Sequence, residues 1–183
     1  MKNSIIYSII LISFFAFSIC ACTDKVDDPP NINEEELITT VELTFTNDSN
    51  SNDVRMFQFA DTDGVGGNEP TAHDTIRLDT NSSYTLQVRF LDESGSTVED
   101  ITEEVEEEAD EHLVCYTSNG ALSVSITDID GNSLPLGLEA IVTTGQQEVT
   151  DLNVQLKHQP DVKNGSCDLG ETDVEVLFRV EVE

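Results

Sequence analysis

Three histidines are the side chains of this sequence best suited to bind a transition metal. His73, His112 and His158 each stand beside acidic or polar residues near the end of an expected element. Glu108 precedes His112 by four positions, which would place both side chains on one face of a helix. These two ligands, together with a histidine from a neighbouring loop, could hold Zn²⁺ or another divalent cation. The alternative is that His112 caps its helix and His158 only ends a strand.

Two short acidic segments resemble part of a calcium-binding EF-hand loop. They are the Asp-x-Asp-Gly sequences at residues 61–64 and 128–131. A full loop needs oxygen ligands at positions 1, 3 and 5 ahead of the glycine at position 6. Aligning the glycines in this way puts Phe59 and Ile126 at position 1, where neither side chain can bind calcium. We therefore expect turns at both places, and weak, non-selective cation binding by the acidic surface.

The composition and motifs argue against nucleic-acid binding and against catalysis. The 183 residues include 37 acidic and 8 basic side chains, for a formal net charge of −29, whereas nucleic acids and anionic lipids attract basic surfaces. The sequence contains no Gly-x-Ser-x-Gly elbow, no His-Glu-x-x-His pair and no P-loop. Neighbouring carboxylates carry little information in a chain this acidic. We expect no enzyme and no nucleic-acid partner.

The first residues have the pattern of a bacterial lipoprotein signal. Lys2 is followed by an uncharged run over residues 3–23 with an apolar centre. Cys22 follows the small residue Ala21 and has the aliphatic Ile19 three positions before it, which resembles a lipobox. Cys20 fits this motif poorly, because the bulky Ile19 would directly precede it. We expect a signal peptide over residues 1–21 and lipid on Cys22, with an uncleaved membrane anchor as the alternative.

Residues 22–36 are charged and rich in proline, and they are expected to form an extended tether. Lys25, Asp27 and Asp28 resemble the acidic export signal of Bacteroidota surface lipoproteins. A merely solvated linker is the alternative interpretation. The chain is therefore expected in the cell envelope, attached by its lipid to the outer membrane, with its body facing either the periplasm or the cell surface.

Two further cysteines, Cys115 and Cys167, remain in the body of the chain. In an oxidising compartment two such thiols suggest a disulfide. Cys115 also lies in an apolar run, where a free thiol can pack as a small hydrophobic group. The sequence leaves both alternatives open, while the absence of a Cys-x-x-Cys spacing argues against a cysteine metal site.

Alternating apolar and polar residues dominate positions 37–183 and predict strands with one buried face. The apolar positions of the clearest strands are Val41, Leu43, Phe45, Tyr84, Leu86, Val88, Phe90, Leu152, Val154 and Leu156. Eight or nine strands without a βαβ rhythm predict a mainly all-β domain, an antiparallel, immunoglobulin-like β-sandwich. A small closed β-barrel is the alternative.

One acidic segment departs from this alternation. Over residues 98–112 an apolar stripe recurs every four positions and predicts a short amphipathic helix. Asp100 and Glu103 are spaced as a capping box at its start, and His112 is placed to meet the dipole at its end. The members of the stripe are Ile101, Val105, Ala109 and Leu113.

Four stretches together resemble a family of small Bacteroidota envelope lipoproteins, some of which are labelled type 1 periplasmic binding fold proteins. The stretches are DTDGVGGNEP at residues 61–70, EEADEH at 107–112, LKHQP at 156–160 and GETDVE at 170–175. The resemblance spans nearly the whole mature chain in matching order. It implies an accessory of a TonB-dependent receptor and no known catalytic residue.

These observations predict a lipid-anchored binding or accessory protein that supports uptake of a ligand or metal at the outer membrane. Its binding surface would include the end of the helix and the loops that carry the histidines. The alternative is a structural or interaction lipoprotein that binds no small molecule.

Overall fold

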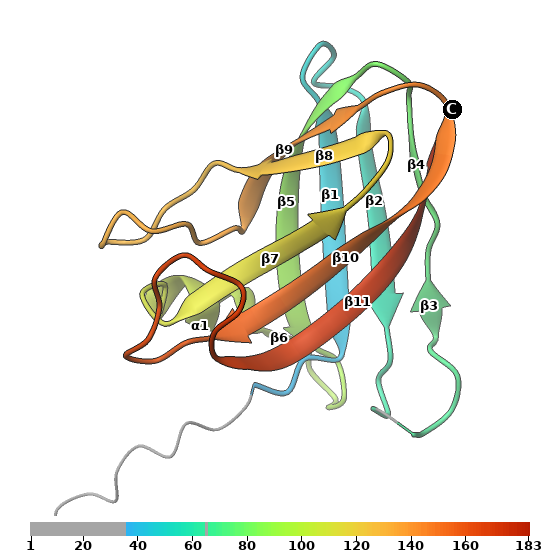
Figure 1. Cartoon of the computed structure of the whole chain (residues 1–183). Helices are drawn as coiled ribbons and strands as arrows, with labels where there is room; N and C mark the ends of the chain where they lie inside the picture. The colour runs from blue at the N-terminus through green and yellow to red at the C-terminus, as the bar shows by residue number, and fades with distance from the viewer. Residues whose placement is uncertain (1–35, 65) are drawn as a thin grey trace, which may run out of the picture. The chain divides into compact units, whose positions relative to one another are not determined.

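The computed structural model describes residues 36–64 and 66–183, which form two β-sheets and one short helix (Figure 1). Sheet A has the strand order β3-β2-β1-β5-β9-β8, with β6 paired to β5, and sheet B has the order β4-β11-β10-β7. The strands of sheet A are β1 (Thr40–Asn47), β2 (Val54–Ala60), β3 (Ala72–His73), β5 (Ser83–Asp92), β6 (Glu99–Asp100), β8 (Leu122–Ile126) and β9 (Glu139–Thr144). Those of sheet B are β4 (Ile76–Leu78), β7 (His112–Ser118), β10 (Glu148–His158) and β11 (Glu171–Val182).

The predicted β-sandwich is confirmed, and the sheets do not close into a barrel. The described residues form eleven strands rather than eight or nine, since β3 and β6 have two residues each, too few to show a period. All strand pairs are antiparallel except β4 with β11. No βαβ unit occurs within the described residues, so they do not have the α/β architecture that a periplasmic-binding label implies.

The alternating apolar side chains meet between the two sheets. β1 pairs with both β2 and β5, and the ring of Phe45 on β1 is fully buried. It packs edge-on against Phe57 of β2 and Tyr84 of β5, with ring centroids 5.9 and 6.3 Å apart. Sheet B adds a second row of buried side chains to the same cluster: Leu152, Val154, Leu156, Val176, Phe178, Val180 and Val182. Burial of each large side chain contributes about 1.5–3 kcal/mol, so this interior holds the sheets together.

The acidic helix is shorter than its apolar stripe predicts. The stripe predicts a helix over residues 98–112, whereas α1 covers Thr102–Glu107. Glu99 and Asp100 pair with β5 as β6, and His112 is already the first residue of β7. Cross-strand pairing and burial in the sheets therefore outweigh the helical period at both ends of this segment.

The predicted capping box is only partly right, because the Asp100 carboxylate accepts from the Thr102 N–H at 3.2 Å but the cap position of α1 is the next residue. The residue before α1 is Ile101, which makes no side-chain capping hydrogen bond. The Thr102 hydroxyl instead bonds to the backbone of Phe90, accepting from its N–H at 2.9 Å and donating to its carbonyl at 3.2 Å. These bonds fix the start of α1 to β5. The expected burial of Ile101 and Val105 is confirmed.

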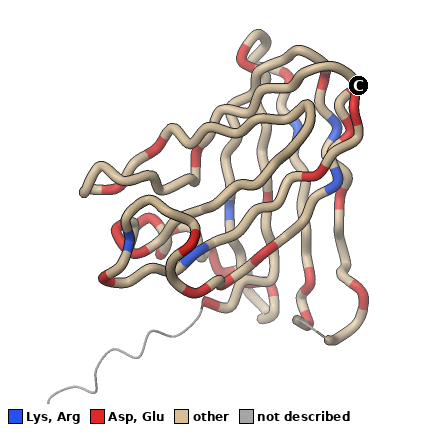
Figure 2. The backbone as a smooth tube through the Cα atoms, viewed as in Figure 1, with Lys and Arg blue, Asp and Glu red and all other residues tan. Residues whose placement is uncertain are grey.

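Acidic residues are spread over the strands and loops of this fold, and α1 is especially rich in them (Figure 2). Lys and Arg residues are few and scattered among them (Figure 2). Within residues 36–64 and 66–183, none of the helical structure has the length and apolar character needed to cross a bilayer.

Cys115 of β7 and Cys167 of the 159–170 loop between β10 and β11 form a disulfide, which decides between the two alternatives left open above. The same loop carries Lys163, whose ammonium group lies 2.8 Å from the Asp130 carboxylate and donates to the Ala109 carbonyl at 2.6 Å. Both charged side chains are almost fully buried. Together these contacts join the 127–138 loop, the 159–170 loop and the segment after α1 at one end of the sandwich.

The disulfide is expected to make a large contribution to stability. Its cysteines are 52 positions apart, and closing a loop of this length removes about 4 kcal/mol of chain entropy from the unfolded state. The double variant Cys115→Ala/Cys167→Ala should therefore unfold at a lower urea concentration than the oxidised wild-type chain. Adding a reductant should shift the wild-type midpoint and leave that of the double variant unchanged. Equal midpoints for the oxidised wild type and the variant would contradict this account.

Candidate functional site

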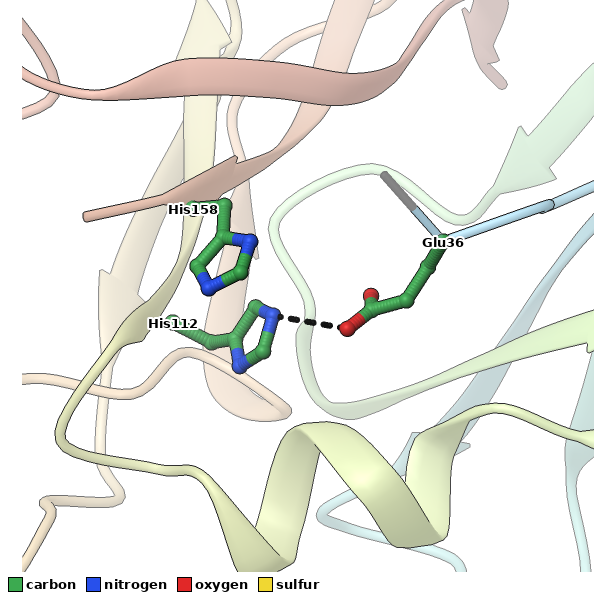
Figure 3. A group of neighbouring side chains, drawn as sticks. All are labelled: Glu36, His112 and His158. Carbon is green, nitrogen blue, oxygen red and sulfur yellow. Dashed lines mark ion pairs between the residues drawn. The ribbon is translucent and has the colours of Figure 1, made fainter. Parts of the chain in front are cut away.

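Two histidines face each other across neighbouring strands at one end of sheet B. His112 begins β7, His158 ends β10, and the antiparallel register pairs them directly. Two positions earlier in this register, and so on the same face, the pair Leu156 with Val114 belongs to the hydrophobic core, and the histidines therefore continue the inner face of the sheet. Their rings stack with centroids 4.4 Å apart and planes 20° from parallel (Figure 3). Both are buried, with 0% and 3% of their surfaces exposed.

A carboxylate from the first of the described residues completes this group. Glu36 lies just before β1, and one of its carboxylate oxygens is 3.3 Å from Nε2 of His112 (Figure 3). Only 8% of the Glu36 side chain is exposed. Its second oxygen, Oε2, is buried and has no hydrogen-bond partner among residues 36–64 and 66–183. A buried carboxylate oxygen left in this state is unusual and indicates room for another positively charged or donor group.

The opposite side of the His112 ring is fixed by the backbone. Nδ1 of His112 lies 3.2 Å from the carbonyl oxygen of Glu108. A carbonyl can only accept a hydrogen bond, so Nδ1 carries the proton and Nε2 is the atom directed at Glu36. This is the arrangement of metal-binding histidines, which donate one ring N–H to a carbonyl or carboxylate and ligate through the other nitrogen.

The charge state of His112 reflects two opposing effects. Burial disfavours the imidazolium and is the largest single influence on its pKa. The hydrogen bond and charge of Glu36, the Glu108 carbonyl and the charge of Asp173 act in the other direction, and together they raise the pKa of His112 above its ordinary value. A buried cation at this position is therefore stabilised by the surrounding carboxylates.

Glu36, His112 and His158 can place one oxygen and two nitrogens within 4.8 Å of one another. Two imidazoles and a carboxylate are ligands that Zn²⁺ and related divalent ions accept, with bonds of about 2.0–2.2 Å. The side chains would have to move together slightly to bind such an ion. Three protein ligands would leave a fourth position open for water or for an exchanging ligand.

A second group of potential ligands shares His158 with the first. Glu108, Glu111 and His158 also offer three ligand atoms within 4.8 Å of one another. The Glu111 carboxylate lies 3.6 Å from Nε2 of His158, and 41% of its side chain is exposed. Glu108 is exposed as well. This outer group therefore lies between the buried pair of rings and solvent.

The carboxylates around the site repel one another. The pKa of Glu104 on α1 is raised, first by its partial burial and then by the charges of Glu36 and Glu108. The negative potential that raises this pKa also favours a cation at the site.

The structure brings together His112, His158 and Glu108 from the predicted ligand set, but not His73. His73 lies on β3, where its Nε2 is 3.1 Å from the Leu177 carbonyl and its ring packs edge-on against Phe59 and Phe178. The prediction that it joins the other histidines is therefore wrong.

The helical spacing proposed for Glu108 and His112 is also wrong. Glu108 is the C-terminal cap of α1 and His112 lies in β7, so the two do not share a helix face. His112 nevertheless bonds the Glu108 carbonyl, and His158 ends its strand as expected. The predicted lipid site Cys22 and the signal peptide lie outside the described residues.

Glu36 and Glu111 are site residues that the sequence pattern did not reveal. Glu36 ends a run of three glutamates at the junction expected for the tether, and nothing local separates it from Glu34 or Glu35. Glu36 is the first of the residues that the structure describes, and its side chain belongs to the site. The position of Glu111 directly before His112 was the one local signal.

The two Asp-x-Asp-Gly segments form turns, as expected. The Asp63 carboxylate accepts hydrogen bonds from the backbone and side chain of Asn68. Asp128 accepts from two backbone N–H groups at 2.8 and 3.1 Å, and Asp130 is paired with Lys163. Protein groups therefore satisfy the carboxylates of Asp63, Asp128 and Asp130.

Comparisons of the chain with protein-family models, with curated proteins and with solved structures gave no match.

The raised pKa of His112 predicts how Glu36 affects stability in chelator-treated protein. A histidine with a raised pKa in the folded state adds stability below its unfolded pKa of about 6.5, and this stability is lost as the pH rises through the folded pKa. In Glu36→Gln the pKa of His112 should fall, because burial lowers this pKa and the carboxylate that most strongly raises it is removed. The variant should therefore lose more unfolding free energy at about pH 5.5 than at about pH 8.5.

Urea unfolding at both pH values, with NMR titration of the His112 ring, measures this effect. Glu148→Gln, at the opposite end of β10, removes the same charge and should show no such pH dependence. An equal loss at both pH values in Glu36→Gln would refute the assigned coupling.

Proposed function

We propose that this chain is a lipid-anchored cell-envelope protein whose β-sandwich binds a divalent transition-metal ion through Glu36, His112 and His158. The observation that carries the proposal is the buried trio itself. Two stacked imidazoles face a buried carboxylate that has one oxygen without a partner among the described residues. A dication would satisfy that oxygen and neutralise the buried charge.

Two features support a position outside the cytoplasm. The lipobox-like sequence before Cys22 is the first. The disulfide between Cys115 and Cys167 is the second, because such bonds persist in oxidising compartments and are rare where thiols are kept reduced. The resemblance to Bacteroidota lipoproteins adds a TonB-dependent outer-membrane receptor as the proposed partner. In this role the protein supports metal uptake and catalyses no reaction.

The residues of the site would bind the ion in exchange for a proton. His112 donates a hydrogen bond from its protonated Nδ1 to the Glu108 carbonyl. Nε2 is therefore the nitrogen that must be unprotonated to bind the metal. Glu36 favours either a proton on Nε2 or a metal ion beside it. Protons and metal therefore compete, and affinity should rise with pH until His112 is neutral. Reversible binding of this kind suits capture and transfer of an ion.

Metal binding can be tested with matched histidine variants of the full chain. Isothermal titration with Zn²⁺ should give about one ion per wild-type chain at this site. His112→Gln and His158→Gln should each weaken binding by more than the roughly 10–100-fold that loss of an outer-shell partner causes. His73→Gln should bind as wild type does, because His73 lies on β3 and contacts other side chains.

Circular dichroism should show that all three variants fold, so that lost binding can be assigned to lost ligands. No saturable binding of any divalent transition-metal ion by the folded wild-type chain would refute the metal site. A structural or interaction role would then be the better account of this protein.

The lipid anchor makes a separate prediction at Cys22. Native protein should carry the mass of attached acyl chains and begin at Cys22, and it should remain with the membrane, because more than one chain anchors stably. Cys22→Ser should lack this mass. Mass spectrometry of the native product measures both properties. A bare thiol with residues 1–21 still attached would contradict the proposed anchor.

A further inference from the structure

We infer that Glu108, Glu111 and His158 form a second, outer metal position that loads the buried trio, with His158 shared between the two. The inference rests on the proposed function, because the ion delivered is the one that Glu36, His112 and His158 would hold. The outer position would be occupied briefly, and the inner position at equilibrium.

Burial gives the first reason for an entry position. The side chains of the inner trio are almost closed to water, with exposed fractions of 8% for Glu36, 0% for His112 and 3% for His158. A hydrated ion needs ligands that it can meet before it sheds its water. Glu108 is exposed and Glu111 is partly exposed, and both can place a carboxylate oxygen within 4.8 Å of a ring nitrogen of His158, so they can supply such ligands.

The backbone holds the outer group beside the inner one. The N–H of Glu111 donates to the Glu108 carbonyl at 2.8 Å, and the Glu111 carbonyl accepts from the N–H of Gln159 at 2.6 Å. The buried Gln159 side chain donates to the carbonyls of Ser166 and Leu169, which flank the disulfide cysteine. Glu111 is thereby fixed next to His158 by a loop that is itself covalently attached to β7.

Charge gives the direction of approach. A shallow pocket of about 340 Å³ adjoins Glu108, and all of its lining residues are acidic. They are Glu99, Asp100, Glu103, Glu104, Glu107 and Glu108. A surface of one sign raises the local concentration of opposite charges and speeds their association by about 10- to 1,000-fold.

Transfer requires that the inner trio bind the ion more tightly than the outer group, and the two sets of ligand atoms differ in this direction. The outer group offers two carboxylates and one imidazole, whereas the inner trio offers one carboxylate and two imidazoles. Imidazole suits zinc and related ions better than carboxylate does. An ion that reaches His158 from the carboxylates would therefore gain affinity by moving to His112. In the transfer Glu108 and Glu111 release the ion while Glu36 and His112 bind it, a net exchange of one carboxylate ligand for one imidazole. A proton held on Nε2 of His112 leaves to solvent in the same exchange.

Stopped-flow kinetics with Zn²⁺ on the full-length chain, purified in detergent, can separate loading from binding. In Glu108→Gln/Glu111→Gln the rate constants for association and dissociation should both fall, by about tenfold. The equilibrium dissociation constant should change by less than about threefold, since the inner ligands remain. Glu108→Gln keeps the backbone carbonyl that bonds His112. The double variant Glu148→Gln/Asp151→Asn removes the same charge from exposed positions early in β10 and should keep wild-type rates.

The possible failures are distinct. Binding with wild-type rates in Glu108→Gln/Glu111→Gln would overturn the loading position and leave the inner site intact. A slower association with unchanged dissociation would also overturn it, because the two carboxylates would then be resident ligands. An equal slowing in the control variant would show a general charge effect and would overturn the position as well. Absence of Zn²⁺ binding by the wild-type chain would instead refute the proposed function.

Discussion

The antiparallel pairing of β7 with β10 is the interaction on which the candidate site depends. Its register sets His112 opposite His158, and a slip of one residue would turn one of the two rings to the other face of sheet B. The core fixes this register from the inner face through pairs such as Val114 with Leu156. The disulfide at Cys115 fixes β7 from the outer face, where it fastens the 159–170 loop. The stacking of the imidazoles is therefore a consequence of sheet geometry.

Electrostatics sets the second constraint. A chain with a formal net charge of −29 repels itself, and an ionised carboxylate taken out of water needs a counter-charge nearby. Among the described residues, two buried pairs meet this need. Asp130 is paired with Lys163, and Glu36 is paired with His112. The first pair uses a permanent cation, whereas the second uses a group that can be neutral, protonated or metal-bound. This difference makes the Glu36 position suited to reversible binding and the Asp130 position suited to holding loops together.

The segment around α1 shows how local and tertiary preferences compete. The apolar stripe correctly identified Ile101 and Val105 as buried, because the short observed helix directs the same side chains inward as the longer predicted helix would. It placed the end of the helix wrongly, since His112 gains more from pairing in β7 than from another helical turn. The choice of Glu108 and His112 as neighbours was therefore right in outcome and wrong in its reason: a carbonyl, and not a shared helix face, connects them.

The sequence by itself determined that the body is mainly β, because the alternation of apolar and polar residues requires strands with one buried face, and it favoured a β-sandwich over a closed barrel. The strand order in the structure decided for the sandwich. The sequence also identified His112, His158 and the cysteine pair by residue type. Only the tertiary structure decided that Glu36 and Glu111 join these histidines, that His73 lies elsewhere, and that Cys115 is bonded to Cys167. The physical reason is that side-chain periodicity is a local property, whereas strand order and register bring together residues that are distant in the chain. Such contacts are selected by packing of the whole core, and no short stretch of sequence contains that information.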